Sequence, residues 1–236
     1  MTAGFALNPE IAVRREIIGN EREPVLAIDG LLRDPAALVE FADAADFAPA
    51  HGPAGGYPGL RAPAPLDYVG NVVRSLTPLI ARAFGLGPVE PTRAECFLSL
   101  VTLPPGDLHP TQRLPHIDTV DPLQFALLHY LCGPPHGGTA FYRHEATGFE
   151  RITADRRAAF EAAVAREAAE SPAAGYLTGN RDGYVQTGRI DAAFDRLVIY
   201  RSQLLHSGQI TAPEALSADP RRGRLTANIF VAFRRG

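Results

Sequence analysis

Two histidines and one aspartate have the residue types and the spacing to bind a transition metal. His116 and Asp118 are two residues apart, and His206 follows much later in the chain. Alternate side chains of a β-strand lie on one face, so a strand at this position would project His116 and Asp118 together. Two imidazoles and one carboxylate form the facial ligand set of non-haem iron(II), which leaves three coordination positions open. The pattern therefore predicts an iron site with room for a co-substrate and O2.

A second pair of residues, Arg224 and Thr226, could bind a carboxylate. The pair stands at the start of the last apolar stretch, residues 225–233. If that stretch is a strand, Arg224, Thr226 and Asn228 share one face, and the apolar residues between them take the other. A guanidinium offers paired N–H donors and a threonine adds an O–H, so this face predicts an anion clamp.

These motifs together resemble the signature of the 2-oxoglutarate/Fe(II)-dependent dioxygenase superfamily, in particular its prolyl-hydroxylase-like branch. The resemblance implies iron on His116, Asp118 and His206, and 2-oxoglutarate on Arg224 and Thr226. The arginine lies further from the distal histidine than in many relatives. The added segment contains two prolines and is typical of a lengthened loop.

The family often adds a tyrosine contact to 2-oxoglutarate on the strand after the His-x-Asp motif. Tyr130 and His129 both lie in the apolar run that follows, and either could take this place. His129 is otherwise interpreted as a hydrogen-bonded core imidazole or as a substrate contact.

The same resemblance implies a mainly β, α+β fold of one domain. A double-stranded β-helix, or jelly roll, would span residues 93–236, with a supporting extension of helices and strands over residues 1–92. Short apolar runs predict the strands 11–13, 25–28, 96–103, 125–131, 139–142, 197–200 and 225–233. Capping residues and helical spacing predict helices from Asp34-Pro35 to about residue 45, over 67–84 with a kink or restart at Pro78, and over 154–170.

The Gly/Pro-rich stretch 47–65 predicts a loop. It is either a plain surface loop or a lid in which Tyr57 and Arg61 contact substrate. Gln124, at the head of a predicted strand near the metal, is a further candidate substrate contact. A second stretch rich in Gly, Asn and Asp, residues 171–188, also predicts a loop.

The composition excludes several other classes of protein. The chain has no lysine, which excludes a Schiff-base lysine and a Walker P-loop. A net charge of −3 gives no basic footprint for nucleic acid, and no apolar run approaches the ~20 residues of a membrane span. Residues 1–20 lack the layout of a secretory signal, so we expect a cytoplasmic protein without nucleic-acid or membrane partners.

The expected function is oxidative. Iron(II), 2-oxoglutarate and O2 would hydroxylate an unactivated C–H bond of an amino acid, a peptide or a small metabolite, acting on a small-molecule or peptide substrate, and a homodimer is possible. The carboxylate of Asp118 argues against halogenation, because halogenating relatives have a small residue there. Two alternatives stay open: a non-catalytic cupin-like metal- or ligand-binding module, and a cupin-type hydrolase or isomerase that uses His129 or His136 as an extra ligand.

Overall fold

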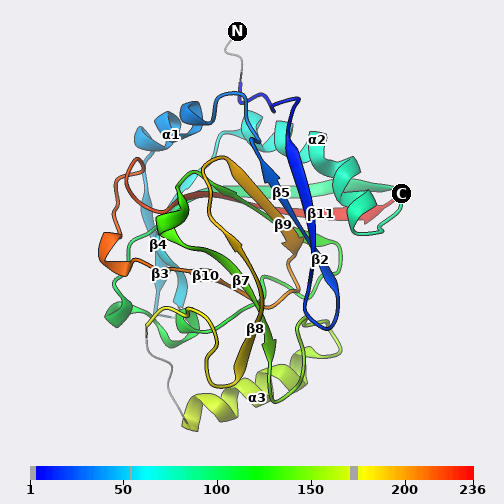
Figure 1. Cartoon of the computed structure of the whole chain (residues 1–236), viewed down its shortest axis with the longest axis vertical. Coiled ribbons are helices and arrows are strands. Elements are labelled where there is room, and N and C mark those ends of the chain that lie inside the picture. Colours follow the sequence, from blue (N-terminus) through cyan, green and yellow to red (C-terminus); the bar gives the residue numbers. More distant parts are fainter. Residues whose placement is uncertain (1–3, 54, 171–174) are drawn as a thin grey trace.

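The computed structural model describes residues 4–53, 55–170 and 175–236 (Figure 1). Its described strands form two antiparallel sheets. The large sheet has the order β1-β2-β9-β6-β11-β5-β4-β3, and the small sheet has the order β10-β7-β8. Three α-helices of the described chain lie outside the sheets, with α1 and α2 at one end of the molecule and α3 at the other.

The elements have the following bounds. The strands of the large sheet are β1 (Ala12–Ile18), β2 (Glu23–Asp29), β3 (Ala48–Gly52), β4 (Gly55–Pro63), β5 (Val89–Val101), β6 (Gln124–Tyr130), β9 (Arg196–Arg201) and β11 (Leu225–Arg235). The strands of the small sheet are β7 (Gly138–His144), β8 (Tyr184–Asp191) and β10 (His206–Gln209). The helices are α1 (Pro35–Asp43), α2 (Leu66–Ala83) and α3 (Arg157–Glu170).

From β5 onward the chain passes back and forth between the two sheets. β5, β6, β9 and β11 are neighbours in the large sheet, while β7, β8 and β10 form the small one. The segment between β5 and β6 joins the small sheet's edge through a single bridge, His116 to His206. This path is that of a double-stranded β-helix with one short strand reduced to a bridge, so the predicted jelly-roll fold is confirmed.

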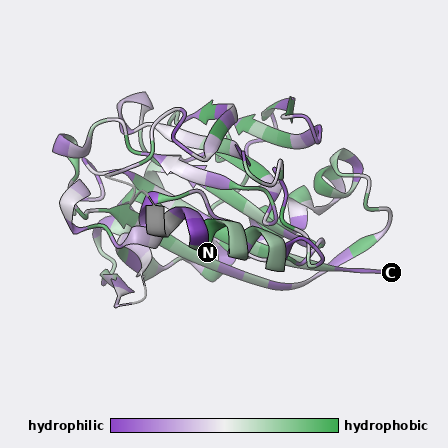
Figure 2. Cartoon of the chain, turned by 90° about the horizontal axis from the view of Figure 1, so that it is seen from below, coloured by the Kyte–Doolittle hydropathy of each residue, from purple (hydrophilic) through white to green (hydrophobic). Residues whose placement is uncertain are grey.

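The hydrophobic core lies on both faces of the large sheet. One face packs against α1 and α2, whose buried apolar residues form one cluster with the sheet. The other face packs against Phe141 and Ile190 of the small sheet. Figure 2 shows hydrophobic residues concentrated along the strands in the interior. The large sheet is therefore buried on both sides, which explains the near-continuous apolar runs of its central strands.

The local signals at the helix ends behave as the sequence predicts, with one exception. Asp34 caps α1 by accepting a hydrogen bond of 3.3 Å from the Ala37 N–H, and Gly85 follows α2 with a positive φ of 63°. The predicted restart at Pro78 is absent, because α2 runs through this proline without interruption. No helix of the described chain is long and apolar enough to cross a membrane.

The prediction of a loop over residues 47–65 is wrong, and with it the lid interpretation. This stretch forms the hairpin of β3 and β4, and β4 pairs with β5. Gly59 permits the pairing because a Cβ at this position would overlap the carbonyl oxygen of Leu100. Gly59 thus allows the main chains of β4 and β5 to approach closely. This pairing with a strand distant in sequence cannot be inferred from local composition.

One other expectation about the chain needs revision, because β8 begins inside the second predicted loop, 171–188; residues 171–174 lie outside the described chain. The strands of residues 1–92 are β1, β2, β3, β4 and the beginning of β5, and they belong to the large sheet.

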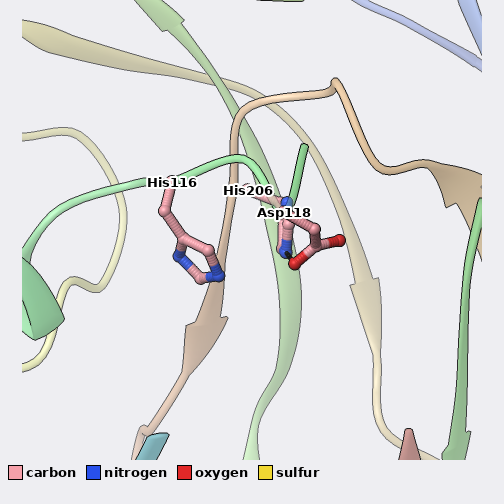
Figure 3. A group of neighbouring side chains, drawn as sticks. All are labelled: His116, Asp118 and His206. Atoms are coloured by element: carbon pink, nitrogen blue, oxygen red, sulfur yellow. Dashed lines mark ion pairs between the residues drawn. The ribbon is translucent and has the colours of Figure 1, made fainter. Parts of the chain in front are cut away.

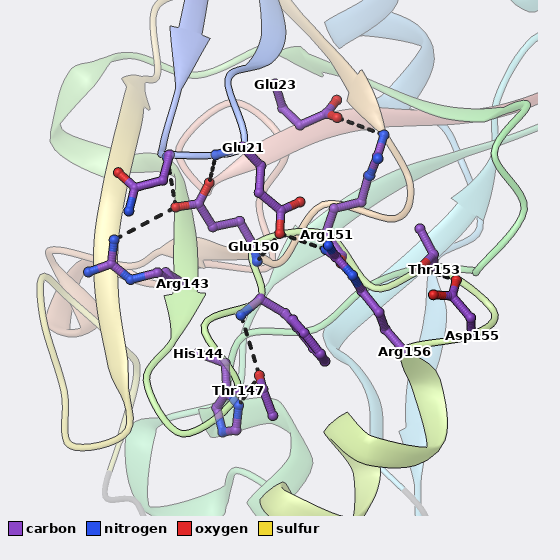
Figure 4. Close-up of polar contacts among 12 residues, drawn as sticks. Glu21, Glu23, Arg143, His144, Thr147, Glu150, Arg151, Thr153, Asp155 and Arg156 are labelled. Carbon is purple, nitrogen blue, oxygen red and sulfur yellow. Dashed lines mark hydrogen bonds and ion pairs between the residues drawn. The ribbon is translucent and has the colours of Figure 1, made fainter.

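A buried glutamate ties the β1–β2 turn to the segment between β7 and α3 (Figure 4). The Glu150 carboxylate accepts hydrogen bonds of 2.9 and 2.8 Å from the N–H groups of Asn20 and Glu21. Arg156 then pairs with Glu21 at 2.6 Å. The carbonyl oxygen of Glu150 accepts from Leu205, the residue before His206, so this network also supports the main chain that carries the distal histidine.

Candidate metal centre and its cavity

His116, Asp118 and His206 converge at one point between the two sheets. Their ligand atoms all lie within 4.8 Å of one another, and His206 Nε2 is 3.8 Å from an Asp118 carboxylate oxygen. Figure 3 shows the three side chains directed into a common space. Two nitrogens and one oxygen at this separation match the facial ligand set that holds non-haem iron(II).

The main chain around His116 is not the regular strand that the sequence predicts. His116 and His206 exchange two main-chain hydrogen bonds of 2.9 Å, and the Asp118 N–H donates to Ser202 O at 2.9 Å. The motif therefore gains its geometry from pairing with the segment 202–206, and not from strand alternation along its own length.

The unsatisfied groups at the centre fit a metal ion. The Nδ1 of His206 lies 2.8 Å from Leu204 O, so it carries the proton and leaves the Nε2 lone pair free. One carboxylate oxygen of Asp118 is buried and has no hydrogen-bond partner in the described chain. A buried carboxylate oxygen without a partner is costly unless a cation or a donor satisfies it.

Burial keeps both histidines in the form that binds metals. It lowers the pKa of His116 to about 4, with a smaller contribution from the neighbouring His206. Burial likewise lowers the pKa of His206 to about 4. His116 nevertheless keeps an exposed surface where it lines the cavity, so the burial that lowers its pKa is that of a ring surrounded by protein but open to the cavity. Both imidazoles are therefore neutral at physiological pH.

The three residues line a cavity of about 570 Å³. Its floor is the face of the large sheet that the small sheet covers only in part, and Arg224, Asn228, Arg61 and Gln124 also line it. The predicted alternation along 225–233 is seen in part: Arg224 and Asn228 line the cavity, whereas Leu225, Ala227 and Val231 belong to the apolar core, and Ile229 belongs to the core but also borders the cavity. The volume exceeds what a small dicarboxylate alone requires.

Arg224 is held rigidly at one end of the cavity. Its Nε and Nη2 donate to the carbonyl oxygens of His136 and Gly138 at 3.1 and 2.9 Å, and its guanidinium lies 5.5 Å from the centre of the Tyr130 ring. These contacts use two of the five N–H donors of an arginine. Beside it, the Thr226 hydroxyl is buried and has no well-formed hydrogen bond among the described residues.

The two tyrosines of this end have different environments. The Tyr130 hydroxyl already makes one hydrogen bond, of 2.6 Å, with Thr139 Oγ1. The Tyr57 hydroxyl is buried and lacks a good hydrogen bond in the described chain. Burial raises the pKa of Tyr57, and the charges of Arg224 and Arg61 and an interaction with the Thr226 hydroxyl oppose that rise.

The structure separates the remaining predicted substrate contacts. Arg61 and Gln124 line the cavity with the metal ligands. His129 does not: its ring is fully buried on the opposite face of β6, 3.0 Å from the Tyr68 hydroxyl and 3.0 Å from Asp195. The structure thus corrects the substrate-contact prediction for His129 and favours the core interpretation.

Asn228 and Tyr176 also line the cavity, although the sequence assigned them no role. Asn228 was recognisable only by its place on the same strand face as Arg224, and its carbonyl oxygen is buried without a partner in the described chain. Tyr176 lies in a Gly-rich segment with no periodic signal, and its hydroxyl donates to Leu103 O at 2.7 Å.

Comparison with known proteins identifies the family of this chain. A sequence model for a family of unknown function (DUF6445) matches residues 9–231. The chain belongs to the DUF6445 family. No curated protein sequence matches this DUF6445 chain.

Several solved structures are distantly similar to the DUF6445 chain. AviO1 from Streptomyces viridochromogenes Tue57 is 18% identical, with 94% of this chain and 89% of that one covered and a TM-score of 0.44. HygX from Streptomyces hygroscopicus, solved with nickel, 2-oxoglutarate and hygromycin B bound, is 11% identical over 94% of this chain and 82% of that one, with a TM-score of 0.43. An N-substituted L-amino acid dioxygenase from Burkholderia ambifaria AMMD is 12% identical over 91% and 83%, with a TM-score of 0.39.

Proposed function

We propose that this DUF6445 chain is an iron(II)- and 2-oxoglutarate-dependent oxygenase that hydroxylates an unactivated C–H bond. The observation that carries the proposal is the convergence of His116, Asp118 and His206 at the bottom of a cavity. Two neutral imidazoles and a carboxylate with one buried oxygen that lacks a hydrogen-bond partner in the described chain form a donor set for iron(II). With 2-oxoglutarate and O2, the bound iron would supply the oxidation, in which one oxygen atom enters the substrate and the other enters succinate as CO2 is released.

The residues of the chain would orient the reactants. Arg224 and Tyr57 line the cavity, and the buried Thr226 hydroxyl interacts with the Tyr57 hydroxyl at the same end. Together they suit the far carboxylate of 2-oxoglutarate, because a carboxylate accepts several hydrogen bonds and Arg can bind it through two parallel N–H groups. The two carbonyl contacts of Arg224 fix the clamp before the co-substrate arrives.

The structure gives each side chain at the metal a separate task. The bond from Nδ1 of His206 to Leu204 O fixes the tautomer and directs Nε2 to the metal. The bridge between His116 and His206 sets the separation of the two imidazoles. Tyr200, whose ring centre is 4.7 Å from that of His206, packs against this imidazole and limits its contact with water.

An anaerobic titration with Fe(II) and 2-oxoglutarate tests this proposal. We expect the weak visible charge-transfer band that forms when a keto acid chelates iron(II). The band should be lost in His206→Ala and should require much more 2-oxoglutarate in Arg224→Gln. Arg221→Gln is the matched control, because Arg221 is exposed and pairs with Asp43 at 3.1 Å.

Two results would contradict the proposal in different ways. A folded protein that gives no band lacks the site. A protein that gives the band but never forms succinate above the uncatalysed rate, with any substrate offered, would be the non-catalytic binding module that the sequence left open.

A further inference from the structure

Arg61 on β4 is a half-buried cation that forms no ion pair with a described residue, although the charge of Asp118, a candidate metal ligand, acts on it from further away. Its Nε is buried and has no hydrogen-bond partner among the described residues. Its guanidinium carbon lies 4.6 Å from the centre of the Tyr57 ring and 5.4 Å from that of Phe97, so aromatic faces hold it in place. By contrast, Arg196 pairs with Asp29, and Arg201 pairs with Glu23.

The position of Arg61 is fixed relative to the anion clamp. In the sheet register Arg61 pairs with Ser99 of β5, and Ser99 pairs with Thr226 of β11. Adjacent strands are about 4.8 Å apart, so the main chains of Arg61 and Thr226 stand roughly 10 Å apart on one row. Two cationic groups therefore face one cavity from different strands, and a single small carboxylate has no need of both.

The balance of charges in the cavity also leaves one cation without a counter-charge. The described side chains around the metal centre provide one carboxylate, Asp118, and two guanidinium groups, Arg61 and Arg224. Arg93 and Glu95, further out on β5, pair with each other at 3.6 Å and balance. A divalent ion and a doubly charged 2-oxoglutarate would leave one positive charge near Arg61. A buried cation without a counter-charge is unfavourable, so a monoanionic ligand is the natural complement.

We propose that Arg61 binds an anionic group of the hydroxylated substrate, and that this group is a carboxylate. The inference rests on the function proposed above and specifies its substrate class. A single remaining charge favours a carboxylate over a doubly charged phosphate, and the forked guanidinium suits it geometrically. Leu128 and Phe230 line the neighbouring floor, so the rest of the substrate has an apolar part. The unpartnered carbonyl oxygen of Asn228 calls for a hydrogen-bond donor on the same molecule.

Binding of simple anions tests this assignment without knowledge of the natural substrate. We would use calorimetry with acetate, 3-phenylpropionate, phenylphosphonate and the neutral 3-phenylpropionamide. Each would be titrated into the protein loaded with Ni(II) and 2-oxoglutarate, and into the metal-free protein. The variants are Arg61→Gln, Arg61→Lys and the control Arg74→Gln, which changes an exposed arginine on α2. Loss of the Arg61 guanidinium removes no described hydrogen bond, so the variant should fold.

We expect the loaded wild type to bind 3-phenylpropionate better than the amide and better than phenylphosphonate. Arg61→Gln should weaken the binding of 3-phenylpropionate about tenfold or more. Arg61→Lys should restore part of that affinity, and Arg74→Gln should leave it unchanged. The affinity for 2-oxoglutarate itself should stay within about twofold in Arg61→Gln.

Four results would overturn the inference: equal binding of acid and amide, preference for the phosphonate, unchanged carboxylate affinity in Arg61→Gln, or no anion binding at tens of millimolar. A large loss of 2-oxoglutarate affinity in Arg61→Gln would instead assign Arg61 to the co-substrate. Failure of the wild type to take up metal and 2-oxoglutarate counts against the proposed function alone, because the metal-free arm still reports whether Arg61 binds anions.

Discussion

The main chains of His116 and His206 are joined by two hydrogen bonds of 2.9 Å, one in each direction. Their ring centres are consequently 4.4 Å apart. Ligands from distant parts of the sequence thus acquire their mutual geometry from one β-bridge. The strength of that bridge does not depend on a metal, so the two imidazoles are positioned before an ion binds.

Metal binding should stabilise the folded protein, and the loss of one ligand should abolish that effect. An ion at a hundred times its Kd raises the free energy of unfolding by about 2.7 kcal/mol. We therefore expect Mn(II) to raise the Tm of the wild type and to leave that of His206→Ala unchanged in thermal unfolding. Asp121→Asn serves as the control, because the Asp121 carboxylate accepts a local hydrogen bond from the Leu123 N–H and this residue does not line the cavity. A full metal-induced shift in His206→Ala would count against this ligand.

Removal of the hydroxyl group should lower stability at one buried tyrosine, Tyr68, and ligand affinity at another, Tyr57. Tyr68→Phe leaves the Nδ1 of the fully buried His129 without its partner, so it should cost about 1–3 kcal/mol of stability. Metal and 2-oxoglutarate binding should be unchanged, since Tyr68 does not line the cavity.

Tyr57→Phe removes a hydroxyl that has no well-formed hydrogen bond in the described chain. Its free energy of unfolding should therefore change little, while its affinity for 2-oxoglutarate should fall several-fold through the loss of one hydrogen bond worth about 1 kcal/mol. Denaturant unfolding and the anaerobic titration measure the two effects. Equal behaviour of the two variants would show that the hydroxyls do not differ as described.

A side chain at Gly59 should push β4 away from β5. A Cβ at this position overlaps the carbonyl oxygen of Leu100, and main chain cannot move as a flexible side chain does. Gly59→Ala should cost about 1–3 kcal/mol, as overpacked sites do. Gly106→Ala is a fair comparison, because nothing lies within 4 Å of its added methyl group. Chemical denaturation of both variants measures this cost. Similar midpoints would show that the main chains of β4 and β5 are not in close contact at Gly59.

The loss of Glu150 should destabilise the β1–β2 turn. Its carboxylate accepts two main-chain hydrogen bonds while almost fully buried, and hydrogen bonds to a charged group contribute about 1.5–3 kcal/mol. Glu150→Ala should therefore lower the midpoint of unfolding, and hydrogen exchange of the Asn20 and Glu21 amides should become faster. Glu161→Ala, an exposed position on α3, provides the comparison. Unchanged exchange at both amides would contradict the network.

Residue type and local periodicity predicted the parts of the site that depend on residues close together in the sequence. The alternation of Arg224, Thr226 and Asn228 follows from the period of a strand, and it held because β11 is buried on both faces. The ligand types predicted the metal centre independently of the path of the chain. The hairpin of β3 and β4 was missed because its stability comes from pairing with β5, and Gly- and Pro-rich residues carry no local signal of that pairing.

The roles of individual polar groups at the site depended on three-dimensional neighbours. From the sequence we predict Tyr130 as a co-substrate contact and Tyr57 only as a substrate contact. Only the structure shows that the Tyr130 hydroxyl already makes a hydrogen bond with Thr139, and that the Tyr57 hydroxyl has no well-formed one in the described chain. His129 was ambiguous for the same reason, because the face of β6 on which it lies depends on the register with β9 and β11.

The environment of Asp195 bears on how the protein could be engineered. Its carboxylate accepts hydrogen bonds from the Leu32 N–H at 3.1 Å and from His129 at 3.0 Å, and its own N–H donates to Tyr130 O at 2.9 Å. One side chain thus fastens the N-terminal segment to the central strand of the barrel. A truncated protein starting at residue 93 would lack Leu32 and Tyr68, so this carboxylate and the imidazole beside it would lose hydrogen-bond partners in an apolar interior. Residues 93–236 should therefore not fold independently, so fusion or grafting experiments have to include the first 92 residues.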